Sequence, residues 1–526
     1  MRGGRGYSPF DARLDRDADM LVISFAVMPG LTRHPASFSC GRMQSGTSDQ
    51  VRGDEEGRRP LARDDHEPGS RPTINPAIVR SYDLRGVVGR DLTEADAHAL
   101  GLRLANAVRS RGGGTVAVGY DGRLSSPMLE AALVGGLVAG GVAVERTGLG
   151  PTGQLYYAVH ARGLDGGVMV TGSHNPADQN GFKILLGTEP VFGRALRELV
   201  DGPAEPALGG GARGVAVADA YRDRLLEAAE GAPVLRIGWD AGNGATGEMV
   251  RRLTERLPGE HRLIHCEIDG RFPGHHPDPS VPENLRDLIA LVRKGGLDLG
   301  IAFDGDGDRI GVVDADGEIV WPDQLLLFLA EDVLARRAGA PVVADVKSSR
   351  VLFDGVAAAG GRGVLSPSGY VLIREAMLRT TAPLAGEMSG HIFFKHRWYG
   401  FDDALYASVR LIEAVAASGK SLTQLRTEMP TSVSTPELRF PVDESRKFAV
   451  IEEVRDRLSA DGASVDATDG VRVKTAEGWW LLRASNTQDV LVARAEATDQ
   501  RGLDLVVAEI DQQLALSEIE RTEGDH

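Results

Sequence analysis

The chain has 526 residues, of which 42% are hydrophobic and 25% charged, and its formal net charge is −16. This length exceeds what one hydrophobic core supports, so several domains are expected in a globular protein. The negative charge argues against general affinity for nucleic acid or anionic membranes, and an anionic substrate would need a local cationic pocket. The two cysteines, Cys40 and Cys266, have neither disulfide-framework nor metal-site spacing, which fits a reducing cytoplasm.

Residues 1–73 differ from the rest of the chain, because they are rich in glycine, proline and charge and show little periodicity. Such a segment buries too little apolar surface to offset its ordering entropy, so we expect a disordered extension, or translation from a start placed too far upstream. The apolar run at 20–31 is too short to span a bilayer and follows acidic residues, which argues against a secretory signal.

From residue 74 onward, the pattern alternates between strands and helices. Strands are expected at 115–121, 167–172, 234–240, 261–269, 297–303 and 341–346, and helices at 126–142, 219–229, 247–257, 283–295, 323–338 and 401–418. The C-terminal part has shorter strands at 478–485 and 491–497 and a closing helix at 502–517. We therefore predict an α/β fold with three successive mixed α/β domains of similar topology, at 74–218, 219–320 and 321–435, and a smaller α+β domain at 436–518.

A polar turn, TGSHNP, ends the strand expected at 167–172 and carries Ser173 and His174; Lys183 stands ten residues after the serine. The ordinary interpretation is a turn, since Asn-Pro and Thr/Ser clusters commonly end strands. The alternative is a nucleophile at the mouth of the strand. The segment does not match the Gly-x-Ser-x-Gly elbow of hydrolases.

The motif DGDGDR at 304–309 follows the strand expected at 297–303, and its aspartates are Asp304, Asp306 and Asp308. Ligands of open α/β sheets bind beyond the carboxyl ends of strands, where this motif lies. Neighbouring carboxylates repel, and a divalent cation removes that cost; oxygen-only ligands favour Mg²⁺. Arg309 suits a phosphoryl oxygen. An EF-hand is excluded because Arg309 occupies its glycine position and Ala315 its glutamate position.

Two further loops carry polar side chains. In GEMSGH, residues Glu387, Ser389 and His391 alternate, so an extended segment would present all three on one face toward sugar hydroxyls, although a polar strand edge looks the same. In RASNTQD at 483–489, an arginine, hydroxyls and an amide suit a phosphate, although a plain turn is equally consistent.

The segment GNGATG at 242–247 matches the dinucleotide fingerprint, with Glu267 and Asp269 about twenty residues further on. An NAD-dependent oxidoreductase is therefore an alternative class. The other interpretation is a tight strand-to-helix turn in which glycine supplies a positive φ. The oxidoreductase hypothesis leaves the aspartates and the Ser173 loop without a role.

Taken in order, TGSHNP, DGDGDR, GEMSGH and RASNT resemble the motif set of the α-D-phosphohexomutase superfamily, and most closely its phosphomannomutase/phosphoglucomutase group. The resemblance extends from residue 79 to the C-terminal helix and includes HHPDP (275–279) and GFDDALYA (400–407). It implies four domains around a central cleft. It also implies interconversion of hexose 1-phosphate and hexose 6-phosphate, of mannose or glucose, through an enzyme phosphoserine and a hexose 1,6-bisphosphate. GNGATG is then a structural turn.

The resemblance also implies a role for each motif residue. The expected catalytic residues are Ser173, His174, Lys183, Arg309 and Arg85. The expected Mg²⁺ ligands are Asp304, Asp306, Asp308 and the phosphate on Ser173. The expected sugar-binding residues are Glu387, Ser389, His391, Gly369 and Tyr370. The expected phosphate-binding residues are Arg483, Ser485, Asn486, Thr487 and Lys347. Glucose 1,6-bisphosphate is expected as activator and intermediate. Hexose phosphates are the expected partners, without nucleic acid or membrane, and the oligomeric state stays open.

Three positions depart from the family pattern. Asp489 stands where the family usually has proline, Tyr370 where histidine is common, and Arg374 where lysine is common. These departures bear on substrate preference, and the glucosamine-phosphate branch has a GEQSGH-like sugar loop. A phosphoglucosamine mutase, a related phosphotransferase or phosphatase, and a sugar-phosphate-binding protein without catalysis are therefore the alternatives.

Overall fold

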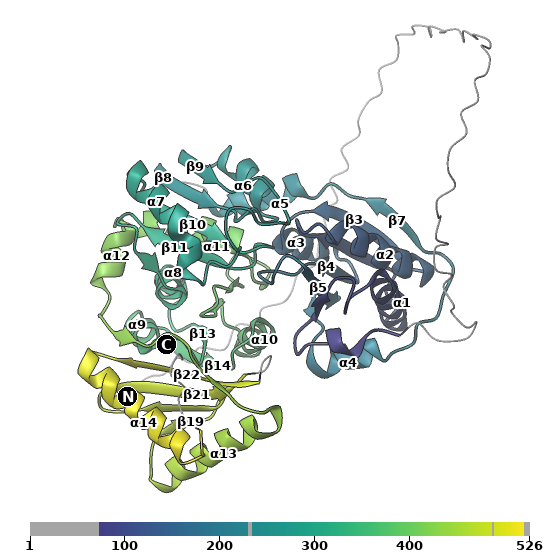
Figure 1. The fold of residues 1–526 in the computed structure, drawn as a ribbon. Coiled ribbons are helices and arrows are strands. Elements are labelled where there is room, and N and C mark those ends of the chain that lie inside the picture. The colour runs from purple at the N-terminus through teal and green to yellow at the C-terminus, as the bar shows by residue number, and fades with distance from the viewer. Residues whose placement is uncertain (1–72, 230–233, 486–488, 520–526) are drawn as a thin grey trace, which may run out of the picture. The chain divides into compact units, whose positions relative to one another are not determined.

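The structure, a computed structural model, describes residues 73–229, 234–485 and 489–519 (Figure 1). The extension expected at 1–73 lies outside these ranges except for Thr73, as do Asn486 and Thr487 of the expected phosphate loop. Within the described ranges, the helices are too short or too polar to cross a bilayer. The mixed α/β fold class predicted from the sequence is confirmed.

Domain 1 is built on a seven-stranded sheet with the order β1-β5-β4-β2-β3-β7, and β6 pairs with β5. Its strands are β1 (Leu84–Val87), β2 (Thr115–Tyr120), β3 (Ala143–Leu149), β4 (Gly166–Val170), β5 (Gln179–Leu186), β6 (Glu189–Pro190) and β7 (Gly211–Gly214). Its helices are α1 (Glu94–Ser110), α2 (Ser126–Ala139), α3 (Thr152–Arg162) and α4 (Gly193–Val200), preceded by the 3₁₀ turn η1 (Pro76–Ile78). Helices α1 and α2 pack closely because Gly101 and Gly136 meet; a Cβ at Gly136 would lie 2.1 Å from the carbonyl oxygen of His98.

Domain 2 has a five-stranded sheet with the order β12-β11-β10-β8-β9. Its elements are α5 (Ala218–Leu226), η2 (Glu227–Ala229), β8 (Leu235–Asp240), α6 (Gly247–Thr254), β9 (Gly259–Ile264), η3 (Pro282–Leu285), α7 (Arg286–Gly295), β10 (Leu299–Phe303), β11 (Ile310–Asp314) and β12 (Ile319–Val320). The strand predicted at 261–269 ends earlier than expected. His265 has a φ of 49°, a left-handed conformation that stops the extended backbone after Ile264.

Domain 3 has a four-stranded sheet with the order β14-β13-β15-β16. Its elements are α8 (Pro322–Arg336), β13 (Pro341–Asp345), α9 (Arg350–Ala358), β14 (Arg362–Ser366), α10 (Tyr370–Thr380), β15 (Leu384–Gly386), β16 (Ile392–Phe394), α11 (Ala404–Ser418) and α12 (Leu422–Glu428). The helix expected from residue 401 begins three residues later, because the side chain of Asp403 caps it by accepting from the Tyr406 N–H.

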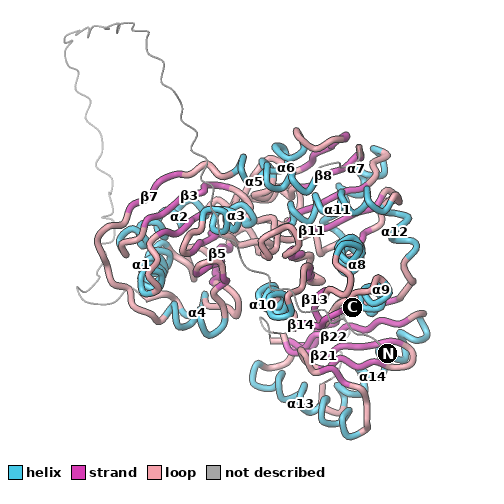
Figure 2. The backbone as a smooth tube through the Cα atoms, turned by 180° about the vertical axis from the view of Figure 1, so that it is seen from behind, coloured by secondary structure: helices cyan, strands magenta, loops and turns pink. Residues whose placement is uncertain are grey.

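Three of the sequence motifs occupy equivalent places in the three sheets. In each, a strand with a parallel neighbour on one side has an antiparallel neighbour on the other: β4 with β5, β10 with β11, and β15 with β16. TGSHNP, DGDGDR and GEMSGH are the connections between these pairs, and Figure 2 shows β5 and β11, the strands that follow the first two motifs, in magenta. This repetition confirms the predicted similarity of topology, and it places each motif at the carboxyl end of a strand, where ligands bind in open α/β sheets.

Domain 4 is an antiparallel sheet with the order β17-β22-β21-β20-β19, and β18 pairs with β22. Its strands are β17 (Val433–Ser434), β18 (Leu438–Pro441), β19 (Val465–Asp466), β20 (Val471–Lys474), β21 (Gly478–Ala484) and β22 (Val490–Ala497), and its helices are α13 (Glu444–Ala460) and α14 (Gln500–Ala515). β17 lies within the range predicted for domain 3, 321–435, but it pairs with β22 and so belongs to this sheet. A separate core forms between this sheet and its helices, with Trp480 fully buried at its centre. The predicted α+β character of this part is confirmed.

Candidate active site

Ser173 lies in a tight loop after β4 and is only 1% exposed. Its φ of 49° is unusual for a residue with a side chain, and such conformations cluster at functional sites. Its Oγ donates to Asp304 Oδ2 at 2.7 Å and lies 3.1 Å from Nδ1 of His174. The serine hydroxyl of domain 1 therefore meets the aspartate motif of domain 2.

Arg123 fixes the conformation of the serine loop, although the sequence offered no motif that singled it out. Its guanidinium is buried and donates to the carbonyl oxygens of Ser173 (2.7 Å), Asn175 (2.6 Å), Pro176 (2.5 Å) and Gln179 (2.9 Å). A buried arginine that satisfies four carbonyl groups leaves the loop little freedom. The orientation of Ser173 is thus set by the fold.

Asp121, at the end of β2, completes this frame. Its carboxylate accepts hydrogen bonds from Ser126 Oγ (2.5 Å), Thr171 Oγ1 (2.8 Å) and the N–H of Gly172, and it lies 3.3 Å from Nε of Arg123. Burial raises the pKa of Asp121 and lowers that of Arg123. The pair therefore depends on mutual charge and hydrogen bonding to remain ionised in the interior.

Asp304, Asp306 and Asp308 are all buried, and each presents an oxygen within 4.8 Å of the others. Asp304 Oδ1 accepts the N–H groups of Gly307 (3.0 Å), Asp308 (3.1 Å) and Arg309 (3.2 Å), so the loop wraps around its own first carboxylate. Burial, together with the charges of Asp308 and Asp306, raises the pKa of Asp304 well above its usual range. Three carboxyl groups this close together can all be ionised only if a cation lies beside them.

Lys183 supplies part of that positive charge. Its buried ammonium group donates to Asp306 Oδ2 at 2.7 Å and contacts Asp308 Oδ2. Although burial by itself lowers the pKa of Lys183, the carboxylates of Asp306 and Asp308 raise it well above the usual value, so the amine stays protonated. Burial likewise raises the pKa of Asp306, but Lys183 outweighs it and brings that pKa below its usual value.

The aspartate loop fits a magnesium ion. Lys183 offsets only one of the three negative charges, and Oδ1 of Asp306 and Oδ1 of Asp308 are buried without a hydrogen-bond partner among the described residues. Unpaired buried carboxylate oxygens are costly, and a cation would satisfy both. Because all available donors are oxygens, the set suits Mg²⁺ better than zinc-class metals.

The backbone of the GNGATG turn packs directly against the aspartate loop. Ala245 donates its N–H to the carbonyl oxygen of Gly305 at 2.9 Å, and a Cβ at Gly244 would lie 2.8 Å from that same oxygen. Gly242 has a φ of 53°, as the turn interpretation predicts. These glycines are therefore explained by a turn and by close backbone packing.

A cavity of about 570 Å³ opens beside Ser173 and is lined by residues of all four domains. Cations outnumber acids on its described walls: Arg80, Arg85, Arg309, Lys347, Arg439 and Arg483 face Asp83, Glu387 and Glu437. A second cavity of about 1070 Å³ shares part of this lining, including His174, Arg309 and Lys347. The cavity is therefore the local cationic pocket that an anionic substrate of this acidic chain would need. A cavity of this size accommodates a sugar phosphate.

Arg85 of domain 1 and Arg309 of domain 2 both line the cavity. Arg85 donates to Asp83 (2.8 Å) and Asn175 (2.6 Å). Burial alone would lower the pKa of Arg85, but the nearby Asp83 carboxylate outweighs burial and raises the pKa above its usual value. Arg309 donates from Nε to Nε2 of His391 at 3.1 Å, and its terminal nitrogens make no hydrogen bond to the described residues. These terminal nitrogens are free for a phosphoryl oxygen.

The sugar-loop prediction assumed an extended segment, and that assumption is wrong. Residues 387–390 form a turn between β15 and β16, closed by the N–H of Gly390 donating to the carbonyl oxygen of Glu387. Glu387, Ser389 and His391 nevertheless line one cavity. Ser389 Oγ has no partner among the described residues, whereas His391 contacts Asp402 (2.8 Å) through Nδ1 and Arg309 through Nε2.

Gly369 and Tyr370 stand at the start of α10 and also line the cavity. Gly369 has a φ of 129°, and a Cβ there would lie 2.6 Å from the hydroxyl of Tyr82, so glycine is required. The ring of Tyr370 stacks on His391 with 5.5 Å between centroids, and the ammonium of Lys183 lies 5.9 Å from the Tyr370 ring centre. Burial raises the pKa of Tyr370, so its hydroxyl stays neutral.

The expected phosphate-binding residues that are described lie on the domain 3 and domain 4 walls of the same cavity. Arg483 donates from Nε to Asp469 at 2.9 Å, and Asp469 accepts the N–H of Ser368 in domain 3 at 3.0 Å. Lys347 lies 3.6 Å from Glu437, and Ser485 lines the cavity beside Arg483. Asn486 and Thr487 lie outside the described residues.

Comparison with known proteins gives a consistent match over this architecture. Four domain descriptions of "Phosphoglucomutase/phosphomannomutase" match in order, alpha/beta/alpha domain I at 76–198, domain II at 219–317, domain III at 321–433 and the C-terminal domain at 437–513. The chain belongs to the phosphoglucomutase/phosphomannomutase family.

Individual relatives are similar over most of their length. A phosphomannomutase/phosphoglucomutase of Pseudomonas aeruginosa is 43% identical over 438 residues, which is 83% of this chain and 95% of the relative. A phosphoglucomutase of Neisseria gonorrhoeae is 42% identical, with coverage of 82% and 96%. A crystal structure of a family protein from Burkholderia thailandensis is 40% identical, with a TM-score of 0.79 and coverage of 85% and 98%.

Family membership makes this chain an isomerase-class intramolecular phosphotransferase, a phosphohexomutase, and the family depends on Mg²⁺ and works through a phosphoserine and a sugar bisphosphate. The resemblance inferred from the four motifs is thereby confirmed. Sequence reasoning gave no role to Asp121, Arg123 or Thr152, which hold the serine and aspartate loops, or to Asp402, which holds His391. Only Asp402 had a signal, its place in the quoted GFDDALYA segment.

Proposed function

We propose that this enzyme interconverts the 1-phosphate and 6-phosphate of glucose and mannose, with Ser173 as its phosphoryl carrier. The observation that carries the proposal is the meeting of three groups at one point. Ser173 Oγ touches Asp304, the aspartate loop has two unpaired carboxylate oxygens, and the cavity beyond is lined by arginines and lysine from all four domains.

The phosphoryl step follows from these contacts. The phosphorus–oxygen bond at Ser173 breaks as the free hydroxyl of the sugar phosphate bonds to phosphorus; the hydroxyl proton passes to a base of the enzyme, and the departing Ser173 oxygen takes up a proton to restore the serine hydroxyl. Burial and the charge of Arg309 hold the pKa of His174 well below its usual value, so His174 is neutral, and its Nδ1 lies 3.1 Å from Ser173 Oγ. Mg²⁺ bound by the aspartates and the serine phosphate would neutralise charge on the transferring group.

Arg309 and Lys183 act on the transferring group in different ways. The free guanidinium nitrogens of Arg309 would hold phosphoryl oxygens directly, whereas Lys183 holds two aspartates in place and stays protonated. Arg85, which donates to Asn175 of the serine loop, would complete the pocket on the domain 1 side. The bisphosphate then returns its other phosphoryl group to Ser173, which restores the starting enzyme.

The opposite walls of the cavity would hold the rest of the substrate. Glu387 and Ser389 offer atoms to sugar hydroxyls, and His391, whose ring nitrogens contact Asp402 and Arg309, would act mainly by positioning that arginine. Arg483, Ser485 and Lys347, with Asn486 and Thr487 of the RASNT motif, would bind the phosphate that is not reacting. Glucose 1,6-bisphosphate would phosphorylate Ser173 before the first turnover. Cys266 is a buried free thiol, which fits a protein of the reducing cytoplasm.

³¹P NMR separates this proposal from its rivals. Enzyme with Mg²⁺ and catalytic glucose 1,6-bisphosphate is given glucose 1-phosphate, mannose 1-phosphate or glucosamine 1-phosphate in parallel. We expect the 6-phosphates of glucose and mannose to accumulate with little inorganic phosphate. Accumulation of inorganic phosphate would identify a phosphatase, and faster turnover of the glucosamine substrate would identify a phosphoglucosamine mutase; either result would contradict the proposal.

A further inference from the structure

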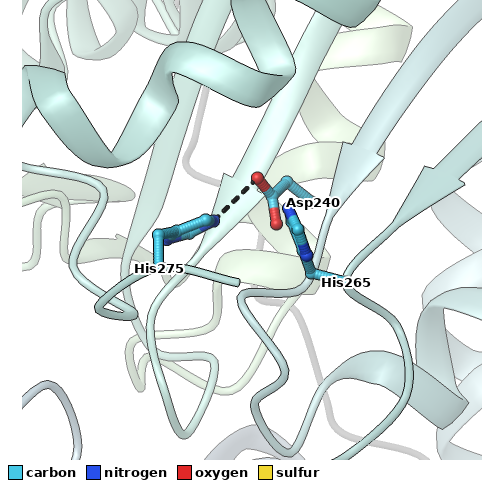
Figure 3. A group of neighbouring side chains, drawn as sticks. All are labelled: Asp240, His265 and His275. Carbon is cyan, nitrogen blue, oxygen red and sulfur yellow. Dashed lines mark hydrogen bonds and ion pairs between the residues drawn. The ribbon is translucent and has the colours of Figure 1, made fainter. Parts of the chain in front are cut away.

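A cluster of two histidines and one aspartate lies in domain 2, apart from the residues that line the two cavities. Asp240 ends β8, His265 directly follows β9, and His275 opens the HHPDP segment. Each residue presents a ligand atom within 4.8 Å of the other two. Figure 3 shows the three side chains converging, with the carboxylate of Asp240 facing His275.

Both ring nitrogens of His275 face oxygen acceptors. Nδ1 lies 2.9 Å from the carbonyl oxygen of His276, and Nε2 lies 3.0 Å from Oδ2 of Asp240. A neutral imidazole has only one N–H, so one nitrogen would direct its lone pair at an oxygen. The arrangement therefore requires positive charge at Nε2, supplied either by a second proton or by a metal ion shared with Asp240.

His265 has one nitrogen occupied and one free. Nε2 lies 3.1 Å from the carboxylate of Asp287, which places the proton on that nitrogen and leaves the lone pair on Nδ1. Nδ1 receives no hydrogen bond from the described residues and faces Gly274, where a Cβ would lie 2.4 Å away. The glycine next to His275 thus keeps the space beside Nδ1 open.

Both histidines share the arrangement that protein metal ligands show. A ligating imidazole usually donates its other N–H to a carboxylate or a backbone carbonyl, which fixes the ring and its tautomer. Asp287 serves His265 in this way, and the carbonyl of His276 serves His275. Asp240 is oriented too, because its Oδ1 accepts the N–H of Gly242 at 2.9 Å and leaves Oδ2 toward the rings.

We propose that Asp240, His265 and His275 form a second metal site, which binds a divalent ion of the zinc class. Two imidazole nitrogens and one carboxylate oxygen suit Zn²⁺, whereas Mg²⁺ prefers oxygen ligands, so this site and the aspartate loop select different metals. The 3.0 Å between Asp240 Oδ2 and His275 Nε2 fits two ligands of one ion, and a water molecule would take the open position.

The bound ion would brace the base of the aspartate loop. The ion would join the ends of β8 and β9 to the HHPDP segment. Pro277 of this segment packs on the GNGATG turn and on the aspartate loop, because Cβ atoms at Gly242 and Gly305 would lie 3.1 and 3.5 Å from its side chain. His265 also holds its left-handed backbone here, a conformation that persists only when the surroundings fix it. Zinc binding should therefore raise the melting temperature without contributing to phosphoryl transfer.

Calorimetric titration with Zn²⁺ in excess Mg²⁺ tests the site, because Mg²⁺ occupies the aspartate loop. We expect wild type and Asp306→Asn to bind one Zn²⁺ per chain, and His275→Gln and His265→Gln to bind it at least about tenfold more weakly. His276→Gln is the matched control, since its exposed side chain lies next to the site and only its carbonyl is used. Equal zinc binding by all variants, or none by wild type, would overturn the proposal.

An NMR titration of wild type keeps the test independent of variant folding. Histidine ring signals are followed in excess Mg²⁺ as Zn²⁺ is added, and those of His265 and His275 are assigned from the signals missing in His265→Gln and His275→Gln. We expect the rings of His265 and His275 to shift together and the other histidines to stay unchanged. A doubly protonated His275 that does not respond to zinc would show that the cluster is an ion pair only.

Discussion

Asp306 is an expected metal ligand and accepts hydrogen bonds from Lys183 and Thr152, so Asp306→Asn affects all three contacts. Turnover should fall at least about 10- to 100-fold, with more Mg²⁺ needed for half-maximal rate, because one anionic ligand is lost. The Mg²⁺-free protein should lose about 1.5–3 kcal/mol, because the buried hydrogen bond from Lys183 is no longer charge-assisted on both sides. Assays across Mg²⁺ concentrations and urea unfolding in EDTA measure these effects; full wild-type activity in excess EDTA would contradict the metal assignment.

This residue also marks a limit of sequence reasoning. From the motif alone, neutralising Asp306 relieves repulsion among three carboxylates and leaves folding unchanged or slightly improved. The structure shows that Lys183, more than a hundred residues away in the chain, pairs with Asp306 and Asp308. Spacing revealed three neighbouring charges, but the cation that offsets one of them comes from another domain, and no local pattern indicates such a contact.

At the scale of the element, the loop between β4 and β5 depends on one buried arginine. Arg123→Lys keeps the charge but cannot donate to four carbonyl groups at once, so the protein should lose about 1–3 kcal/mol of stability. Turnover should fall about 100-fold because Ser173 would no longer be held in place. Urea unfolding and the mutase assay measure these effects. Arg90→Lys is the control, because the Arg90 side chain is 73% exposed. Equal losses of stability and turnover in both variants would contradict the role of Arg123 in holding the serine loop.

The three motif loops of the α/β domains differed in how far their sequences predicted them. TGSHNP and DGDGDR follow buried strands, so their places at strand ends could be read directly. GEMSGH was expected to be extended, but the strands around it have only three residues each, and a turn brings its polar residues to the cavity instead. The strand predicted at 261–269 also ends early, because His265 has a left-handed backbone conformation that the sequence pattern does not reveal.

At the scale of the whole molecule, domain 4 contributes cations to a cavity whose serine is in domain 1. Arg483→Gln should therefore raise the KM for hexose phosphate about 10- to 100-fold and change kcat less, because the phosphate it holds is not the one transferred. Arg457→Gln is a matched control, since that arginine bonds to Gln513 and Ser517 within domain 4 and does not line the cavity. A KM equal to that of wild type would remove Arg483 from the site.

Contacts between domains 1 and 3 should make the molecule sensitive to acid. Burial, together with Arg374 and Lys395, lowers the pKa of His160 to about 4, and its ring packs on Tyr399 and Phe401 of domain 3. The unfolded chain binds this proton near pH 6.5 and the folded chain only near 4, so stability should fall as the pH drops between those values. His160→Phe should show a smaller fall in urea midpoint across this window; an unchanged dependence would contradict the assignment.

The most direct test of the account is the phosphate on Ser173. Wild-type enzyme is incubated with glucose 1,6-bisphosphate and Mg²⁺, its phosphopeptides are mapped by mass spectrometry, and its turnover of glucose 1-phosphate is measured beside that of Ser173→Ala. We predict one phosphate, located on Ser173, and loss of both phosphorylation and mutase turnover in the variant. A variant that still converts glucose 1-phosphate to glucose 6-phosphate at the wild-type rate, or a phosphate on another residue, would contradict Ser173 as the carrier.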